Sequence, residues 1–258
     1  MKKLLALMLC LMLLLSCCAG LAESDKEAVL AKGKLVVGIT DFAPMDYRGT
    51  DGSWIGFDAD MARAFGKFLG VEVEFIEIDW DNKVLELNSG NIDCVCNGMT
   101  LTDEVLSAMS CSNPYANNAQ IVIVPAEKAD DYQTVESLKG LTFAVEAGSA
   151  GEAAAQALGN AFNPVQNQAA ALLEVVAMTS DAAIIDSLMA AAMVGQGTDY
   201  ATLTYTVPLT EEKYGVGFRK DSDLVDALNT FFAAAWADGS MQTIAELYGV
   251  QAAMVPQE

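Results

Sequence analysis

Acidic, aromatic and small polar residues stand at the ends of several apolar segments of this chain. They are Asp41, Phe42, Trp80, Asn97, Gly98, Thr100, Glu146, Gly148, Ser149 and Asp186. The apolar segments before them are typical of strands, and in open α/β sheets ligands bind beyond the carboxyl ends of the strands. The pattern therefore predicts a cleft for a small polar molecule.

Two aromatic residues and one acid in this set could attract a cationic group. Phe42 and Trp80 could sandwich a ligand side chain by stacking or cation–π contact, worth about 0.5–2 kcal/mol each. Both lie at strand ends or in loops, which favours the cleft over a role in the core alone. Asp186 could pair with a ligand amino group, because a buried charge needs a partner. It could also cap the helix that follows.

Four other residues could supply donors to a carboxylate. Gly98 would offer its backbone N–H and allow close approach, and Thr100 would offer its hydroxyl. Gly148 and Ser149 precede a predicted helix, and helix N-termini favour anions. Gly98 could instead only serve a turn, and Gly148 and Ser149 could instead only cap the helix.

Residue types that commonly catalyse reactions are scarce. The chain has no histidine, and no Ser/Lys or Cys/His pair is evident. The carboxylates of Asp41, Glu146 and Asp186 could still transfer protons. An enzyme is therefore the less favoured alternative, and neither a metal nor a cofactor is expected.

Strands and helices alternate along the chain, which indicates an α/β fold with largely parallel sheets. The predicted strands are 34–40, 71–78, 92–97, 120–124, 141–145, 181–185, 203–206 and 214–218. The predicted helices are 58–69, 82–89, 102–109, 167–178, 223–236 and 241–248, with one more opening at Gly148 and Ser149. The alternation restarts after Tyr115, which predicts two lobes.

Residues 1–22 are typical of an export signal, with Lys2 and Lys3 before an apolar run and small residues after it. Two cleavage sites are open. Residues 14–17 resemble a lipobox, in which Cys17 would carry a lipid, and residues 20–22 resemble an ordinary small-x-small site. Both predict a protein that works outside the cytoplasm.

The chain carries 35 acidic and 14 basic residues, a net charge of −21. Such a charge repels nucleic acid and anionic lipid, so the only membrane association we expect is through a lipid on Cys17. The body holds Cys94, Cys96 and Cys111. Cys94 and Cys96 would share one face of a strand, which is poor geometry for a bridge between them. We expect free thiols, although one of the two could pair with Cys111.

Six segments, in order, resemble signatures of the family 3 extracellular solute-binding proteins, the polar amino-acid receptors of ABC importers. They are residues 56–62, 87–93, 98–102, 112–115, 138–140 and 214–218, read as GFDADMA, LNSGNID, GMTLT, SNPY, LKG and YGVGF. Each is weak alone, but six in the correct order and spacing make a specific signal.

The resemblance implies a type II periplasmic-binding-protein-like fold. Each lobe would be a mixed, mostly parallel sheet flanked by helices. Lobe 1 would span residues 25–117 and 213–258 and lobe 2 residues 122–208, with hinge strands near 118–121 and 209–213. The lobes would close on an amino acid or amine, and the closed monomer would dock on an ABC permease driven by its ATPase.

One departure from the family pattern concerns the ligand. The family continues its GmTiT motif to an arginine that clamps the ligand carboxylate by two hydrogen bonds. Val105 stands at that position, and Glu146 stands where some relatives carry lysine. The ligand is then expected to be cationic or to lack a carboxylate. Weak binding of an amino acid through helix N-termini and Thr100, or loss of binding, are the alternatives.

Two other functions fit the same fold. A dehydratase-like enzyme would need a positioned acid or base, and a sensor module would need a membrane span and a signalling domain. The sequence shows no evident acid–base pair for the enzyme, and no evident span or signalling domain for the sensor.

Overall fold

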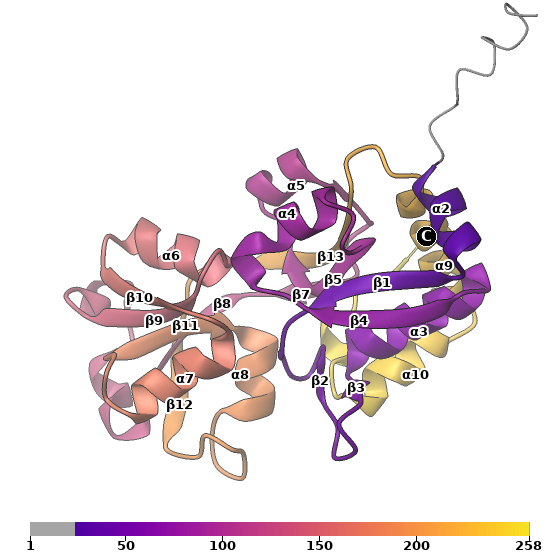
Figure 1. Ribbon diagram of the computed structural model, residues 1–258. Coiled ribbons are helices and arrows are strands. Elements are labelled where there is room, and N and C mark those ends of the chain that lie inside the picture. The colour runs from indigo at the N-terminus through magenta and orange to yellow at the C-terminus, as the bar shows by residue number, and fades with distance from the viewer. Residues whose placement is uncertain (1–23, 258) are drawn as a thin grey trace, which may run out of the picture.

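The structure, a computed structural model, describes residues 24–257 and consists of two α/β lobes placed side by side (Figure 1). The predicted export signal and Cys17 lie outside the described residues. Within the described part, no helix is long and apolar enough to cross a membrane.

Lobe 1 is built on a six-stranded sheet with the order β4-β1-β5-β13-β6, in which β7 also pairs with β13. Its strands are β1 (Lys34–Ile39), β4 (Glu72–Glu77), β5 (Cys94–Thr100), β6 (Ser110–Cys111), β7 (Ala116–Asn118) and β13 (Glu212–Phe218). Its helices are α2 (Asp25–Lys32), α3 (Phe57–Leu69), α4 (Lys83–Asn88), α5 (Asp103–Ala108), α9 (Leu224–Ala237) and α10 (Ser240–Leu247). A small hairpin joins β2 (Tyr47–Arg48) to β3 (Trp54–Ile55).

Lobe 2 is built on a five-stranded sheet with the order β10-β9-β11-β8-β12. Its strands are β8 (Gln120–Pro125), β9 (Thr142–Glu146), β10 (Ala161–Val165), β11 (Ala182–Asp186) and β12 (Leu203–Pro208). Its helices are α6 (Ala150–Leu158), α7 (Gln168–Val176) and α8 (Ser187–Met193). Short 3₁₀ turns lie at Trp80–Asn82, Ala126–Asp131, Val135–Leu138 and Gln251–Ala253.

Both sheets are mixed, and their parallel share is smaller than the sequence pattern predicts. In lobe 1, β1 pairs in parallel with β4 and β5, while β13 is antiparallel to β5. In lobe 2, β9 pairs in parallel with β10 and β11, while β8 is antiparallel to β11. The strands that arrive from the other lobe, β8 and β13, therefore enter antiparallel.

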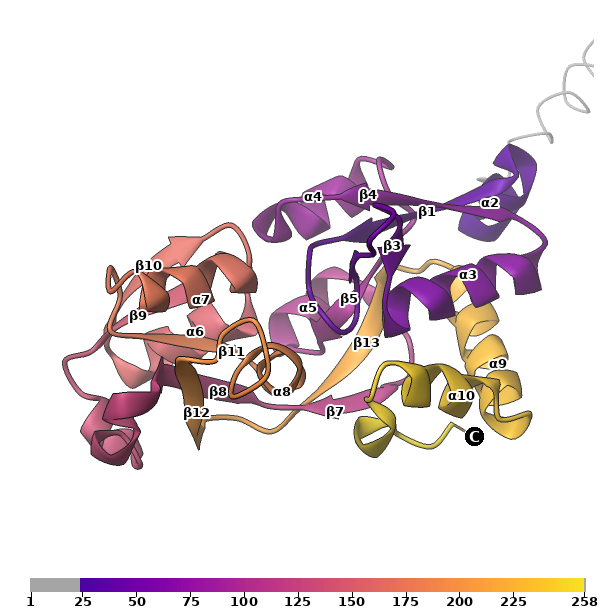
Figure 2. The ribbon, with the colours of Figure 1, turned by 90° about the horizontal axis from the view of Figure 1, so that it is seen from below.

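Two crossings connect the lobes, as Figure 2 shows from below. One leads from β7 to β8 through Ala119, and the other leads from β12 to β13 through residues 209–211. They are bonded to each other: the Leu209 N–H donates to the Gln120 carbonyl at 2.8 Å, and the Gln120 N–H donates to Thr210 Oγ1 at 3.0 Å. The two crossings therefore form one bonded unit.

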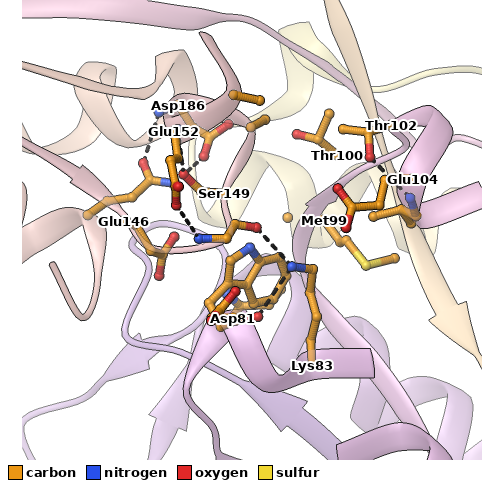
Figure 3. Close-up of a pocket in the computed structure, with 18 of the residues that line it drawn as sticks. Asp81, Lys83, Met99, Thr100, Thr102, Glu104, Glu146, Ser149, Glu152 and Asp186 are labelled. Atoms are coloured by element: carbon orange, nitrogen blue, oxygen red, sulfur yellow. Dashed lines mark hydrogen bonds between the residues drawn. The ribbon is translucent and has the colours of Figure 1, made fainter. Parts of the chain in front are cut away.

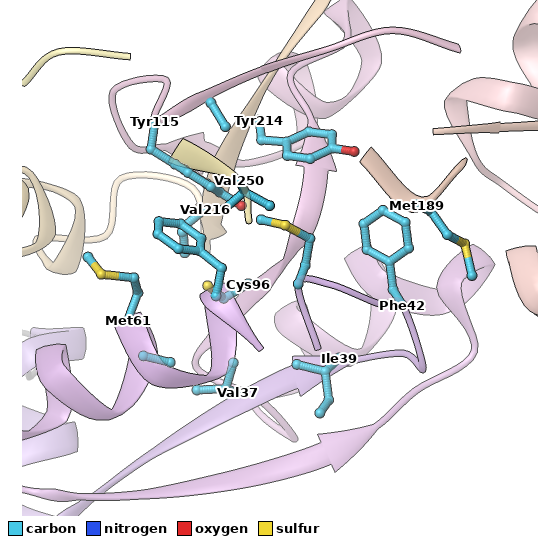
Figure 4. Packing of buried hydrophobic residues seen from close by; sticks show 14 of the residues in the cluster. Val37, Ile39, Phe42, Met61, Cys96, Tyr115, Met189, Tyr214, Val216 and Val250 are labelled. Atoms are coloured by element: carbon cyan, nitrogen blue, oxygen red, sulfur yellow. The ribbon is translucent and has the colours of Figure 1, made fainter. Parts of the chain in front are cut away.

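The largest hydrophobic cluster runs from lobe 1 into lobe 2. It includes Phe42 and Tyr214 of lobe 1 together with Met189 on α8 of lobe 2 (Figure 4). Figure 4 shows the Phe42 ring between Tyr214 and Met189. The structure therefore has the two lobes in contact, a closed arrangement.

The three cysteines of the described chain are free. Cys94 and Cys96 are buried on β5, and Cys111 is half-buried on β6. This confirms the expectation of free thiols in the body of the protein.

Candidate ligand-binding site

A cavity of about 440 Å³ lies between the lobes, with walls from the ends of β5, β9 and β11 and from the starts of α4, α5 and α6. Figure 3 shows the residues that line it. The strand-end residues of the sequence prediction meet here: Phe42, Trp80, Asn97, Gly98, Thr100, Val105, Glu146, Gly148, Ser149 and Asp186.

Asp41 is the exception among the predicted residues. It lies outside this cavity, in a separate surface depression beside Arg48 and Tyr248. Its neighbour Phe42 lines the cavity instead. The strand-end rule finds the right loop but does not distinguish the two neighbours.

The aromatic walls are buried and held in place. Phe42 is 3% exposed and Trp80 is 7% exposed. The Phe42 ring contacts Gly98, where an added Cβ would come within 2.4 Å of it, and meets the Tyr214 ring edge-on with centroids 6.4 Å apart. Gly98 also has a φ of +55°, so glycine is needed both for the backbone and for the ring.

The donors predicted for a ligand carboxylate are already bonded to acids of the protein. The Gly98 N–H donates to Asp58 Oδ2 at 2.6 Å, and the Thr100 hydroxyl donates to Glu212 Oε1 at 3.0 Å. Asp58 also accepts from the Tyr115 hydroxyl at 2.7 Å and is fully buried in lobe 1. The geometry therefore does not support a ligand carboxylate at these two donors.

The donors in the first turn of α6 are also hydrogen-bonded within the protein. Ser149, predicted as a ligand donor with helix capping as the alternative, caps the helix by accepting from the Glu152 N–H at 3.2 Å. The Glu152 carboxylate in turn accepts from the Gly148 N–H at 2.7 Å. An internal carboxylate thus occupies the helix end that could have held the anion of a ligand.

Polar groups in the first turn of α5 and at the end of β5 also have hydrogen-bond partners within the protein. The Thr102 hydroxyl accepts from the Val105 N–H at 3.1 Å and so caps α5. The Asn97 amide bonds to both the N–H and the hydroxyl of Thr40 in lobe 1, each at 2.8 Å. Val105 is 6% exposed and gives this wall an apolar surface.

Asp186 lies at the centre of an amide network at the lobe crossings. Its carboxylate accepts from the side-chain amides of Asn118, Gln120 and Gln168. Asn118 and Gln120 also donate to Glu212 Oε1 at 2.6 and 2.7 Å. Burial raises the pKa of Asp186, and the nearby Glu212 raises it further. The acid end of β11 is thus bonded to the β7–β8 crossing and, through Asn118 and Gln120, to Glu212 on β13.

Glu146 is a buried acid of the cavity with an unpartnered oxygen. It is 4% exposed, and its Oε1 has no hydrogen-bond partner. Burial raises the pKa of Glu146 to about 8, with a further contribution from the charge of Asp186 on the neighbouring strand. An unpartnered buried carboxylate costs free energy unless it is protonated or meets a cation.

Lys83 is a cavity residue that the sequence interpretation missed. It begins α4, is 8% exposed, and its ammonium lies 4.9 Å from the centroid of the Trp80 ring. The sequence did contain a signal for this residue. Lys83 follows Trp80 by three positions, and residues i and i+3 share a helix face, so Lys83 should face the cleft with Trp80. Burial lowers the pKa of Lys83, while the charges of Glu146, Glu104 and Asp81 act in the opposite direction.

Acidic residues outnumber basic ones in the lining. Its acidic members are Asp81, Asp103, Glu104, Glu146, Glu152 and Asp186, and its one basic member is Lys83. With aromatic walls and anion donors that are internally satisfied, such a cavity attracts cations and repels anions. The arrangement suits an amine or guanidinium group better than a carboxylate.

Comparisons with known proteins bear on this site. The sequence model of the bacterial extracellular solute-binding proteins, family 3, matches residues 35–251. This chain belongs to that family. It is 29% identical to the arginine-binding extracellular protein ArtP of Bacillus subtilis over 252 residues, covering 95% of this chain and 96% of that protein. It is 31% identical to a probable histidine-binding protein of Neisseria gonorrhoeae over 245 residues, with 89% and 88% covered.

Solved structures of family 3 relatives agree in fold. A mutant of the arginine-binding protein ArgBP from T. maritima superposes with a TM-score of 0.81 at 28% identity, covering 87% of this chain and 98% of that one. The ancestral amino acid-binding protein AncCDT-1, a precursor of cyclohexadienyl dehydratase, gives 0.80 at 30% identity, with 87% and 99% covered. The predicted type II periplasmic-binding-protein fold is confirmed.

Proposed function

We propose that this protein is the extracellular substrate-binding component of an ABC importer and that it binds a cationic, amino-acid-like amine between its lobes. The relatives that support the general role are named for arginine, histidine and cystine. The observation that carries the choice of ligand is the lining itself, in which two buried acids face one cavity.

The ligand's amine binds Asp186 and its side chain lies between Phe42 and Trp80. The second buried acid, Glu146, meets the positive charge of the ligand with its unpartnered oxygen. A charge-assisted hydrogen bond of this kind contributes about 1.5–3 kcal/mol. Phe42 and Trp80 add stacking or cation–π attraction to the same charge.

The lack of a carboxylate clamp follows from three features. Val105 stands where the family pattern has arginine, and the donors at Gly98 and Gly148 are bonded to Asp58 and Glu152. A ligand carboxylate would lose its hydration without an equivalent replacement. Amines, amidated amino acids and guanidino compounds avoid this cost.

The protein binds its ligand without transforming it. Proton transfer needs an acid or base within reach of the reacting group. Glu146 and Asp186 are the candidates, but in the proposed function both carboxylates bind the positive charges of the ligand. NMR spectra of a ligand incubated with the protein should therefore remain unchanged over hours. Appearance of a product would favour the dehydratase-like alternative.

A thermal-shift screen of the mature protein tests the ligand class. Arginine, agmatine and cadaverine represent cations, glutamine a neutral amino acid and glutamate an anion. A ligand present at a hundredfold its dissociation constant adds about 2.7 kcal/mol to the free energy of unfolding. We expect stabilisation by the cations and none by glutamate. Stronger stabilisation by glutamate or glutamine would contradict the proposed ligand class.

Transport is tested separately, with the purified permease and ATPase in vesicles. The protein saturated with its ligand should stimulate ATP hydrolysis severalfold over the ligand-free protein. The expected location is outside the cytoplasm, held by a lipid on Cys17 or released after residue 22. Mass spectrometry of the mature N-terminus distinguishes these two forms.

A further inference from the structure

Lys83 reaches across the cleft from lobe 1 to lobe 2. Its ammonium donates to the Gly148 carbonyl oxygen at 2.9 Å and to the Trp80 carbonyl oxygen at 3.2 Å. Gly148 belongs to the loop between β9 and α6 of lobe 2, whereas Trp80 and Lys83 belong to lobe 1. Figure 3 shows both bonds.

The lobes also touch at the same point through their backbones. A Cβ added to Gly148 would come within 2.8 Å of the Asp81 Cα, and the φ of Gly148 is +68°. The Gly148 N–H is held by Glu152, as described above, while its carbonyl is held by Lys83. One peptide loop of lobe 2 is therefore clamped from its own lobe and from the opposite lobe.

A buried ammonium in this place needs an explanation, because burial of a charge is unfavourable without partners. Two carbonyl oxygens and the acids Glu146, Glu104, Asp81 and Glu152 provide these partners. Several of them come from lobe 2, so the environment of the ammonium is complete only when the lobes are closed. Opening the cleft would remove the Gly148 bond and return Lys83 to water.

We propose that Lys83 is a latch across the cleft that takes the place of a ligand carboxylate in holding the lobes together. A ligand carboxylate can accept hydrogen bonds from donors on both lobes, whereas a protonated amine only donates hydrogen bonds and cannot replace that bridge. The protein supplies the bridge from Lys83 to the Gly148 carbonyl, and so closes on ligands that lack a carboxylate. This makes Lys83 a residue that determines ligand specificity, and the inference rests on the proposed function.

The latch is tested by Lys83→Met, which keeps an apolar stem of similar length and removes the ammonium. Small-angle X-ray scattering measures lobe closure, and calorimetry measures the affinity for agmatine. We expect the variant to have a larger radius of gyration than the wild type without ligand. We also expect it to bind agmatine at least tenfold more weakly. Lys83→Arg, which keeps the charge and the donors, should restore both properties in large part.

Lys128→Met is the matched control, because Lys128 is exposed on lobe 2 and is not among the residues that line the cavity. It should behave as the wild type in both measurements. Gly148→Ala tests the same contact from the other lobe: its methyl group meets Asp81, so the lobes should stay further apart although Lys83 is intact. This second variant keeps the test available if Lys83→Met does not fold.

Two results would overturn the latch. One is unchanged scattering and unchanged agmatine affinity in Lys83→Met. The other is tighter binding of agmatine by that variant, which would mean that the ammonium mainly repels the ligand. If the wild type binds no cation at all, the proposed function fails, while the ligand-free scattering still decides the role of Lys83.

Discussion

The pH dependence of ligand affinity is the prediction that the structure develops furthest, and it centres on Glu146. Burial and the charge of Asp186 raise the pKa of this carboxyl to about 8. Below pH 8 the free protein therefore holds a proton on Glu146. A cationic ligand pairs with the ionised carboxylate, so its binding releases that proton.

The magnitude follows from the pKa. At pH 7 about ten molecules are protonated for each ionised one, and at pH 6 about a hundred, since each pH unit is tenfold or about 1.4 kcal/mol. The dissociation constant for agmatine should thus fall by about a hundredfold between pH 6 and pH 9 through Glu146 alone, and level off above pH 8. Asp186, whose pKa is also raised, adds to this slope.

Glu146→Gln isolates the contribution of one proton. Calorimetry from pH 6 to pH 9 should give a slope of log Kd against pH that is about one unit smaller than in the wild type below pH 8. Agmatine affinity at pH 9 should be weaker, because the negative charge is gone. Parallel pH profiles for the two proteins would refute the assignment of this proton to Glu146.

Stability provides an independent check with a defined sign. A carboxyl whose pKa is higher in the folded protein than in the unfolded chain destabilises the fold as it ionises. The ligand-free wild type should therefore lose stability as the pH rises from 4.5, the ordinary pKa of a glutamate, toward about 8, the pKa of Glu146 in the folded protein. Glu146→Gln should raise the melting temperature at pH 8.5 and change it little at pH 4.5. A lower melting temperature of the variant at pH 8.5 would contradict the reasoning.

Three further substitutions test other walls of the cavity. Val105→Arg should shift the ratio of arginine to agmatine affinity toward arginine by tenfold or more, the equivalent of about 1.4 kcal/mol, as measured by calorimetry; an unchanged ratio would show that α5 does not face the ligand carboxylate. Gly98→Ala should displace the Phe42 ring, which an added Cβ would approach to 2.4 Å, and weaken agmatine binding while the protein stays folded by circular dichroism. Asp186→Ala should abolish measurable binding and also lower the melting temperature, because three amides lose their acceptor. Unchanged affinity in this last variant would remove Asp186 from the site.

Local features of the structure were accessible from the sequence. Ser149 and Thr102 cap helices that the sequence pattern predicts, and such caps are local because each depends on a residue three positions away. The strand ends gave the loops that form the cavity, since the carboxyl ends of parallel strands meet at one edge. The edge strand β10 was not predicted; it contains Pro164, which an edge strand tolerates.

Contacts between distant segments were not accessible. Gly98 and Thr100 are the right residues in the right loop, but their donors are taken by Asp58 and Glu212, which lie 40 and 112 positions away. From the sequence alone, Lys83 looks like an exposed residue of a surface helix. Its contact with lobe 2 becomes visible only in the structure. Such pairings depend on how the two lobes meet, and no local pattern encodes that.

The same pairings change the interpretation of the missing arginine. From the sequence, Val105 could mean a different ligand, weak binding of an amino acid, or lost function. The structure adds that the cavity also has a buried acid with an unpartnered oxygen, and that the Gly148 donor at the start of α6 is bonded to the protein's own Glu152. These features together favour a cationic ligand over weak binding of an ordinary amino acid.

The central claim is that the cavity selects a cation and does not use a carboxylate. Agmatine and arginine carry the same guanidinium group and differ by the carboxylate, so titration calorimetry of both with the wild-type protein tests it most directly. The structure predicts that agmatine binds at least tenfold more tightly than arginine at pH 8. Tighter binding of arginine would contradict the claim and restore an ordinary amino-acid ligand.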